Sequence, residues 1–98
     1  MELRHLRCFL AVAEELHFAR AAEKLHIEQS PLSRAIKELE EELGEQLFVR
    51  TSRSTRLTRA GKLFLEHLPR VFLAIQQARD SVKAAANGFH SQLRIALS

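Results

Sequence analysis

Apolar side chains recur at intervals of three and four residues in two segments near the start of the chain, which predicts two helices. The apolar stripe of the first helix, over residues 2–16, consists of Leu6, Phe9, Leu10, Ala13 and Leu16. The second helix, over residues 18–25, is shorter, and its small side chains allow another helix to approach closely. Residues 26–29 are predicted to form a turn.

A third helix is predicted to begin at Ser30 and to end at Gly44. Ser30 is a favourable N-cap residue, and Pro31 suits the first helical position, where its missing N–H costs nothing. Glycine is a common helix stop. The buried stripe is expected to consist of Leu32, Ile36, Leu39 and Leu43. Residues 38–42 are strongly acidic and are predicted to form a solvent-exposed face, so only the N-terminal turns of this helix are expected to face nucleic acid.

The next segment, residues 47–57, alternates imperfectly and is rich in Thr, Ser, Val and Phe. This pattern predicts two short strands, at about residues 46–49 and 55–58, joined by a Ser/Arg tip into a wing. A last helix is predicted to be capped by Thr58 and to run to about Asn87 and Gly88. Residues 92–98 alternate again, and we expect them to be the first strand of a further domain or a loose tail. The chain is thus expected to be a fragment of a longer protein.

The apolar positions of the last helix follow a heptad pattern, which is typical of a coiled-coil seam. The predicted dimerisation residues are Phe64, Leu68, Val71, Phe72, Ile75, Ala78 and Val82. Because this stripe is longer than a small domain covers, its outer part is expected to pair with a second copy of the chain. A helix packed wholly on its own domain remains the alternative. Pro69 removes one backbone hydrogen bond and is expected to bend the helix near residues 65–69.

Residues 18–37 together have the layout of a helix-turn-helix, whose second helix enters the DNA major groove. The side opposite its buried stripe is expected to carry Gln29, Ser33, Arg34 and Lys37. Gln binds adenine edges and Arg binds guanine edges bidentately, so Gln29 and Arg34 are the expected base readers. Ser33 is expected to assist at a base or phosphate, and Lys37 to contact phosphate. The helix N-terminus at Ser30 favours an anion.

The wing is locally basic, although the net charge of the chain is only +3. No acidic residue lies between Glu45 and Glu66, a stretch that favours phosphate. Arg53 at the tip is expected to enter a narrow minor groove, where the negative potential is strongest. The expected phosphate and hydroxyl contacts of the wing come from Arg50, Thr51, Ser52, Ser54 and Arg56. A solvated surface loop is the alternative for this segment.

Other features narrow the class of protein. Cys8 is the single cysteine, so no intramolecular disulfide forms, and a buried inert thiol is expected. The five histidines are scattered without metal-ligand spacing, and no glycine-rich phosphate loop or nucleophile motif is present. We therefore expect no catalytic residue, metal or cofactor. No apolar run approaches the ~18 residues of a membrane span, and no signal peptide pattern occurs, so a cytoplasmic protein without a membrane partner is expected.

In these features the chain resembles the N-terminal DNA-binding domain of LysR-type transcriptional regulators over residues 1–88. The matching segments are the opening MELRHLRCFLAVAEELHFARAA, the turn and helix EKLHIEQSPLSRAI, the junction LEEELGEQLFVR and the segment LTRAG. The resemblance implies a mainly α fold, a winged helix-turn-helix of three helices and a two-stranded wing, followed by a long dimerisation linker helix. The implied domains are residues 1–58 for DNA binding, 59–88 for the linker and 89–98 for the start of an effector-binding domain.

The resemblance also implies a bacterial regulator that binds double-stranded promoter DNA with dyad symmetry. Its linker helices pair antiparallel in a homodimer, full-length members form tetramers, and a small-molecule effector binds only to the C-terminal domain. In the family, the positions of Gln29, Pro31, Ser33, Arg34 and Arg53 contact DNA or shape the contact. Ser30, Ala19 and Ala35 depart from the usual residues, and Ala35 is expected to lack a polar partner near the bases. A protein-interaction module that uses the long amphipathic helix is the rival function.

Overall fold

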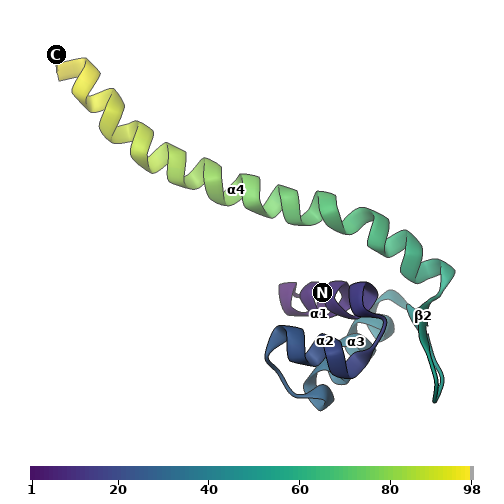
Figure 1. Cartoon of the computed structure of the whole chain (residues 1–98). Helices are drawn as coiled ribbons and strands as arrows, with labels where there is room; N and C mark the ends of the chain where they lie inside the picture. The colour runs from purple at the N-terminus through teal and green to yellow at the C-terminus, as the bar shows by residue number, and fades with distance from the viewer. Residues whose placement is uncertain (98) are drawn as a thin grey trace. The chain divides into compact units, whose positions relative to one another are not determined.

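The computed structural model describes the backbone of residues 1–97 and the side chains of residues 1–87. Its elements follow in the order α1 (Leu3–Glu15), α2 (Phe18–Leu25), α3 (Gln29–Leu43), β1 (Phe48–Arg50), β2 (Thr55–Leu57) and α4 (Arg59–Leu97) (Figure 1). Residues Met1–Leu68 form one compact unit, and the chain from Pro69 onward forms a second. Three helices, a two-stranded wing and a long helix are the predicted fold, which is confirmed.

Each of the first three helices ends at a residue with left-handed backbone conformation. Leu16 at φ 50° follows α1, His26 at φ 57° follows α2, and Gly44 at φ 73° follows α3. In each case the backbone N–H of this residue donates to a carbonyl of the preceding turn, which satisfies a helix-end acceptor. The predicted stop at Gly44 and the predicted bounds of the second helix, residues 18–25, are confirmed.

The start of α3 differs from the prediction. Its N-cap is Glu28, in extended backbone and without a side-chain capping bond, so the expectation that Ser30 caps this helix is wrong. The turn between α2 and α3 consists of residues 26–28, and the helix begins at Gln29. Pro31 is therefore the third helical residue, where the N–H that it lacks still has no partner within the helix.

The core of the compact unit lies between α1, α2, α3, β1 and the first turns of α4. Its most completely buried side chains are Phe9, Val12, Leu32, Leu39, Leu47 and Leu68. The Phe9 ring lies 5.2 Å from that of Phe48 and 5.0 Å from that of Phe64, edge-on to the latter. Burying one such aromatic side chain contributes about 1.5–3 kcal/mol. The ring of Phe9 therefore joins the wing and α4 to α1.

Two predicted stripe positions, and one residue expected near the bases, differ in the structure. Leu16 and Leu43 stand at helix ends and are exposed, because neither is covered by a neighbouring element. Ala35 is 2% exposed and lies in the core of the helix-turn-helix, so the expectation that it faces the bases is wrong. The small side chain is needed where α3 packs inward.

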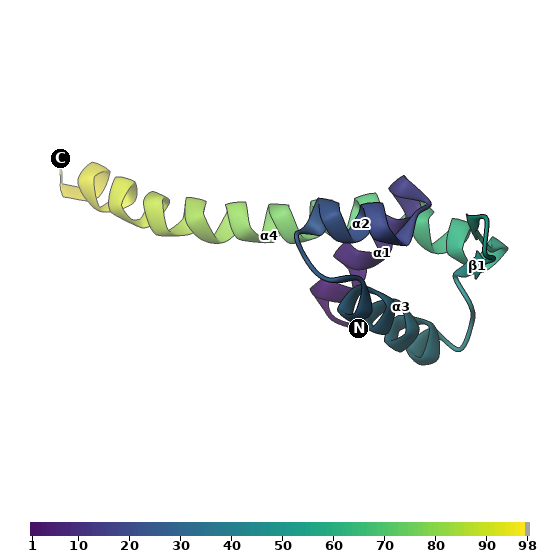
Figure 2. The same ribbon diagram turned by 60° about the horizontal axis from the view of Figure 1, so that its bottom comes forward.

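The wing pairs antiparallel, with Phe48 opposite Leu57, Val49 opposite Arg56 and Arg50 opposite Thr55. Both strands lie within two residues of the predicted bounds. Figures 1 and 2 both show this hairpin beside the start of α4. At its tip the Thr51 N–H donates to the Ser54 carbonyl at 2.8 Å, and the Thr51 hydroxyl accepts from the Ser54 N–H at 3.0 Å. These bonds close the turn that carries Arg53.

Thr58 caps α4, as predicted, because its Oγ1 accepts from the Gly61 N–H at 3.0 Å. Gly61 has a further role that the sequence did not reveal. A Cβ at this position would lie well inside contact distance of the Leu47 carbonyl oxygen. The helix and the start of the wing therefore meet backbone to backbone, which only glycine allows.

The course of α4 corrects two expectations. Leu68 is 1% exposed and belongs to the core, so the prediction that it faces a partner helix is wrong, whereas Phe64 is half-buried with its ring on Phe9, and its place in the seam stays a prediction. The helix continues through Pro69 to Leu97, so the predicted helix end near Gly88 and the strand expected over residues 92–97 are wrong; residue 98 lies outside the described backbone. The bend at Pro69 stays a prediction. Beyond it, Val71, Leu73 and Val82 are exposed.

Candidate nucleic-acid interface

The exposed side of α3 carries the predicted base readers. Gln29, Ser30, Arg34 and Lys37 are exposed and Ser33 is half-buried, while Leu32, Ile36 and Leu39 point into the core. The helical period of 3.6 residues separates these two sets onto opposite sides. Within the described side chains neither Arg34 nor Lys37 forms an ion pair, so both cations are available to an external anion.

The wing presents a second set of polar side chains. Its exposed candidates are Arg50, Ser52, Arg53, Ser54 and Arg56. The guanidinium carbon of Arg50 lies 4.0 Å from the centroid of the Phe18 ring. This cation–π contact fixes the wing against the start of α2, and sequence reasoning missed it. The run of aromatic and basic residues was visible, but their pairing across the fold was not.

Two grooves join the helix and the wing. One, of about 190 Å³, lies between the start of α2 and the wing tip, and its lining includes His17, Gln29, Arg50 and Arg53. The other, of about 460 Å³, lies between α3 and β1 and is lined in part by Ser33, Lys37 and Arg50. The structure thus brings Gln29 beside the wing tip and Lys37 beside Arg50.

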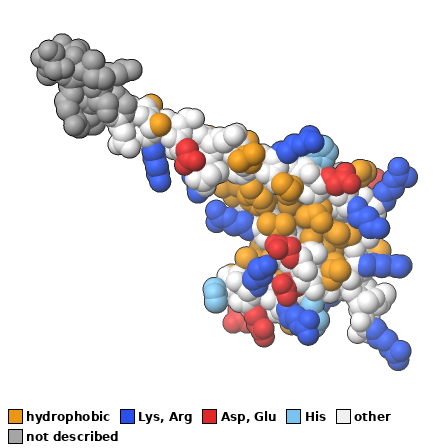
Figure 3. Space-filling view, turned by 45° about the horizontal axis from the view of Figure 1, so that its top comes forward, with side chains coloured by type: hydrophobic (Ala, Val, Ile, Leu, Met, Phe, Trp, Pro, Cys, Tyr) orange, Lys and Arg blue, Asp and Glu red, His pale blue; other side chains and the backbone are white. Residues whose placement is uncertain are grey.

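Other predicted residues lie apart from these grooves. Arg34 and Ser30 are exposed on α3 but line neither groove, and Arg56 lies on β2. Pro31 lines a separate hollow among α1, α2 and α3. Figure 3 shows Lys and Arg side chains projecting around the periphery of the compact unit. On this face the positive charge is therefore spread around the compact unit and not gathered in one place.

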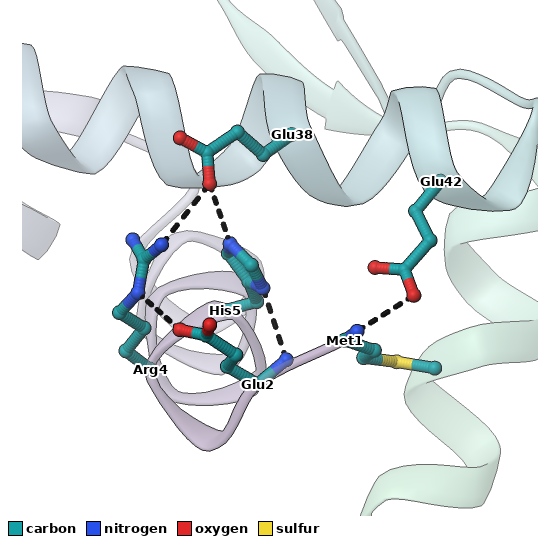
Figure 4. Close-up of polar contacts among 6 residues, drawn as sticks. All are labelled: Met1, Glu2, Arg4, His5, Glu38 and Glu42. Carbon is teal, nitrogen blue, oxygen red and sulfur yellow. Dashed lines mark hydrogen bonds and ion pairs between the residues drawn. The ribbon is translucent and has the colours of Figure 1, made fainter.

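The acidic half of α3 is accessible to solvent, as predicted, but three of its carboxylates also contact other parts of the fold. Glu38 Oε2 lies 2.8 Å from His5 Nε2 and 3.2 Å from a guanidinium nitrogen of Arg4 (Figure 4). Glu42 pairs with the Met1 amine at 2.6 Å. Glu40 accepts from backbone N–H groups at the start of the wing.

The tautomer of His5 follows from its partners. Its Nδ1 accepts the Glu2 backbone N–H at 3.0 Å, so the ring proton is assigned to Nε2, from which it is donated to Glu38. This bond, with the charge of Arg4 adding to it, holds the pKa of the Glu38 carboxyl below its ordinary value, although burial acts in the opposite direction. Arg4 also lowers the pKa of Glu2, to which its Nε donates at 2.6 Å.

Cys8 is 7% exposed, and burial raises the pKa of its thiol, so the predicted buried cysteine is confirmed. No cluster of metal-ligating side chains occurs among the residues that the structure describes. Over the same part of the chain, no helix is both long and apolar enough to cross a membrane.

Similar proteins of known class are numerous. AlsR of Bacillus subtilis (strain 168), an HTH-type transcriptional regulator, is 50% identical over 88 residues, which are 90% of this chain and 29% of AlsR. ShiR of Corynebacterium glutamicum (strain R), also an HTH-type transcriptional regulator, is 48% identical over 98 residues, 100% of this chain and 33% of ShiR. The chain thus spans 29–33% of the length of these two relatives.

Solved structures agree with these relatives. A crystal structure of a CbnR_DBD-DNA complex superposes with a TM-score of 0.85 at 42% identity, covering 88% of this chain and 99% of that one. A BenM_DBD/catB site 1 DNA complex gives a TM-score of 0.82 at 48% identity, covering 88% of this chain and 97% of that one. The model of the family described as bacterial regulatory helix-turn-helix protein, lysR family, matches residues 3–62. The chain therefore belongs to the lysR family of bacterial regulatory helix-turn-helix proteins.

Proposed function

We propose that this chain binds double-stranded promoter DNA sequence-specifically, with α3 in the major groove and the wing in the minor groove. The observation that carries the proposal is the shared lining of the two grooves, which places exposed residues of α3 beside the wing arginines. The similar CbnR and BenM structures are DNA complexes, which supports the same use of this surface.

The residues divide by the chemistry of their side chains. Gln29 and Arg34 read base edges, because their planar groups form bidentate hydrogen bonds. Arg53 enters the minor groove from the closed wing tip. The remaining contacts position the duplex through its phosphates and come from Ser30, Ser33, Lys37, Arg50, Ser52, Ser54 and Arg56. Pro31 shapes the first turn of α3.

We further propose that the chain works as a homodimer through the outer part of α4. The side chains left for this contact are Val71, Phe72, Ile75, Ala78 and Val82, which remain outside the buried core. Residues 1–58 would bind DNA, 59–88 would link and dimerise, and 89–98 would lead to an effector-binding domain. A dimer places two reading helices on a site with dyad symmetry.

The longer protein is proposed to form a tetramer, to bind a small-molecule effector through its further domain and to act in the cytoplasm, where bacterial promoters lie. The family consists of regulators, and we propose that this chain acts by binding, without catalysis or a cofactor.

Selection from a pool of random duplexes, at two salt concentrations, tests the DNA-binding proposal. Enrichment of a dyad-symmetric site is expected, with log affinity falling about 0.9 per phosphate contacted for each tenfold rise in salt. Arg34→Ala should then weaken specific binding by about 1–3 kcal/mol and relax selectivity at one base pair. Equal losses on the selected and on random DNA would contradict the role of Arg34. No binding at all would favour the interaction module.

The dimer is tested by Ile75→Glu, which would bury an unpaired charge between the helices. Sedimentation should show monomers for this variant. Gln77→Glu is the matched control, because Gln77 is exposed and lies off the apolar stripe, and its dimer mass should be unchanged. A dimer that survives Ile75→Glu would contradict the proposed seam.

A further inference from the structure

The carboxylate of Glu40 forms a direct polar link between α3 and the start of the wing at Leu47 and Phe48, which we call the root of the wing. Its Oε2 accepts the backbone N–H of Leu47 at 2.6 Å and that of Phe48 at 3.3 Å. Hydrogen bonds to an ionised acceptor are shorter and stronger than neutral ones, and the 2.6 Å distance fits that class. One side chain of the recognition helix therefore holds two successive peptide groups at the start of β1.

The same two wing residues are fixed from other sides. The Thr58 N–H donates to the Leu47 carbonyl at 2.9 Å, and the Phe48 ring packs on Phe9. Leu47 is only 2% exposed, so its N–H has no solvent to replace the carboxylate. The backbone at Leu47 and Phe48 is thus held on several sides, and Glu40 supplies its polar contact from α3.

Glu40 could affect DNA binding through its charge or through its positioning of the wing, and the two roles predict opposite changes in affinity when the carboxylate is removed. It lines the groove between α3 and β1 together with Lys37 and Arg50, where a phosphate would approach. By charge alone, a carboxylate there opposes phosphate, so its removal should strengthen DNA binding. By positioning alone, its removal should weaken the contacts made by the wing and leave those made by α3.

We propose that Glu40 is a positioning residue of the DNA interface, whose carboxylate sets the placement of the wing arginine Arg53 relative to the base readers on α3. This rests on the proposed function, since it concerns the same surface. Arg53 contributes to affinity only while Glu40 holds the root of the wing, whereas Arg34, which α3 itself carries, contributes with or without it.

A double-mutant cycle on the selected duplex tests this coupling. Arg53→Ala is expected to weaken binding by about tenfold in the wild-type background, a change of about 1.4 kcal/mol. In the Glu40→Ala background the same substitution should cost less than about twofold, because interacting residues are not additive. Arg34→Ala should cost the same in both backgrounds. Glu41→Ala, the loss of an exposed neighbouring carboxylate, should leave the Arg53 effect unchanged.

Two conservative variants distinguish the effect of the length of the Glu40 side chain from the effect of its charge. Glu40→Gln keeps an oxygen acceptor at the same length, so it should retain most of the Arg53 effect. Glu40→Asp keeps the charge but is one methylene shorter, so it should lose that effect. If Glu40→Ala fails to fold, Glu40→Asp decides the question. Hydroxyl-radical footprints of Glu40→Asp should lose minor-groove protection, while protection of guanine N7 in the major groove against dimethyl sulfate persists.

An Arg53 effect of equal size in the wild-type and Glu40→Asp proteins would overturn the positioning role. So would tighter DNA binding by Glu40→Ala, which is the result expected from charge alone. Either result, with a wild-type protein that still selects a site, leaves the proposed function standing. A wild-type chain that selects no site overturns both proposals.

Discussion

Replacing Gly61 with alanine is expected to destabilise the compact unit, although this substitution usually stabilises a helix. Where the backbone accepts it, Gly→Ala gains about 0.4–1 kcal/mol through the unfolded state. At Gly61 the new Cβ would lie 3.0 Å from the Leu47 carbonyl carbon and nearer still to its oxygen, whereas ordinary contacts begin at 3.4 Å. The carbon must therefore retreat by 0.4 Å, and the oxygen by more.

Moving the Leu47 carbonyl lowers the stability of the fold in two ways. Overpacking of this kind costs about 1–3 kcal/mol. The Leu47 oxygen also accepts the Thr58 N–H at 2.9 Å, a bond whose loss costs about 0.5–1.5 kcal/mol. After the usual gain from Gly→Ala is subtracted, the net loss of stability is about 2 kcal/mol. For a domain of this size that lowers Tm by about 8–16 °C.

Urea and thermal unfolding followed by circular dichroism measure the change. The neighbouring exposed residue Lys62 supplies the control, because at that position alanine should be more stable than glycine by about 1 kcal/mol. The order at Gly61 should be the reverse. A Gly61→Ala protein as stable as wild type, or more stable, would refute the backbone-to-backbone packing of α4 on the root of the wing.

Three further predictions concern other contacts of the compact unit. Phe18→Leu removes the ring under Arg50 and should weaken DNA binding about two- to fivefold, the equivalent of a cation–π contact of ~0.5–1 kcal/mol; equal affinities in a titration would contradict it. The pKa of Glu38 is lowered in the folded state, so the ionised carboxylate stabilises the fold fully above the pKa of the unfolded state, and this stabilisation is lost as pH falls through the folded pKa. The Glu38→Gln protein should therefore lose less stability than wild type between pH 6 and 3. Parallel pH profiles of the two proteins would argue against the His5–Glu38 bond. Because burial raises the pKa of Cys8, iodoacetamide should label this thiol only as the protein unfolds, and rapid labelling of the native protein would disprove its inert state.

Local patterns predicted most of the elements because neighbouring residues determine them. The 3.6-residue spacing of Leu32, Ile36 and Leu39 fixes which side of α3 is buried, and it leaves Arg34 and Lys37 on the other side. The first residue of α3 was missed because Ser30 and Pro31 suit an N-cap and a first turn by residue type, whereas the helix begins after Glu28 without a side-chain cap. The same local reasoning took Leu68 for part of a dimer seam, since a heptad pattern does not say which neighbour covers it.

Contacts between residues far apart in the sequence could not be predicted from these local patterns. His5 and Glu38 are 33 positions apart, and nothing in their separate surroundings indicates that they meet. Glycine is required at position 61 because of Leu47, which lies on the other side of the wing, and nothing in the sequence near Gly61 indicates this contact. A pattern gives the side of a helix that is buried, whereas the identity of the partner depends on how the elements pack.

The acidic run of α3 shows how far this difference matters for function. If this run were only a solvated face, its carboxylates on Glu38, Glu40 and Glu42 would repel DNA and would not contribute to the fold. In the structure the charge of Glu38 is met by Arg4, that of Glu42 by the Met1 amine, and that of Glu40 by two peptide N–H groups. These partners reduce the repulsion that the carboxylates exert on a bound duplex. The same contacts anchor α3 to α1 and to the wing, so the acidic half of the helix holds in place the cationic half that faces DNA.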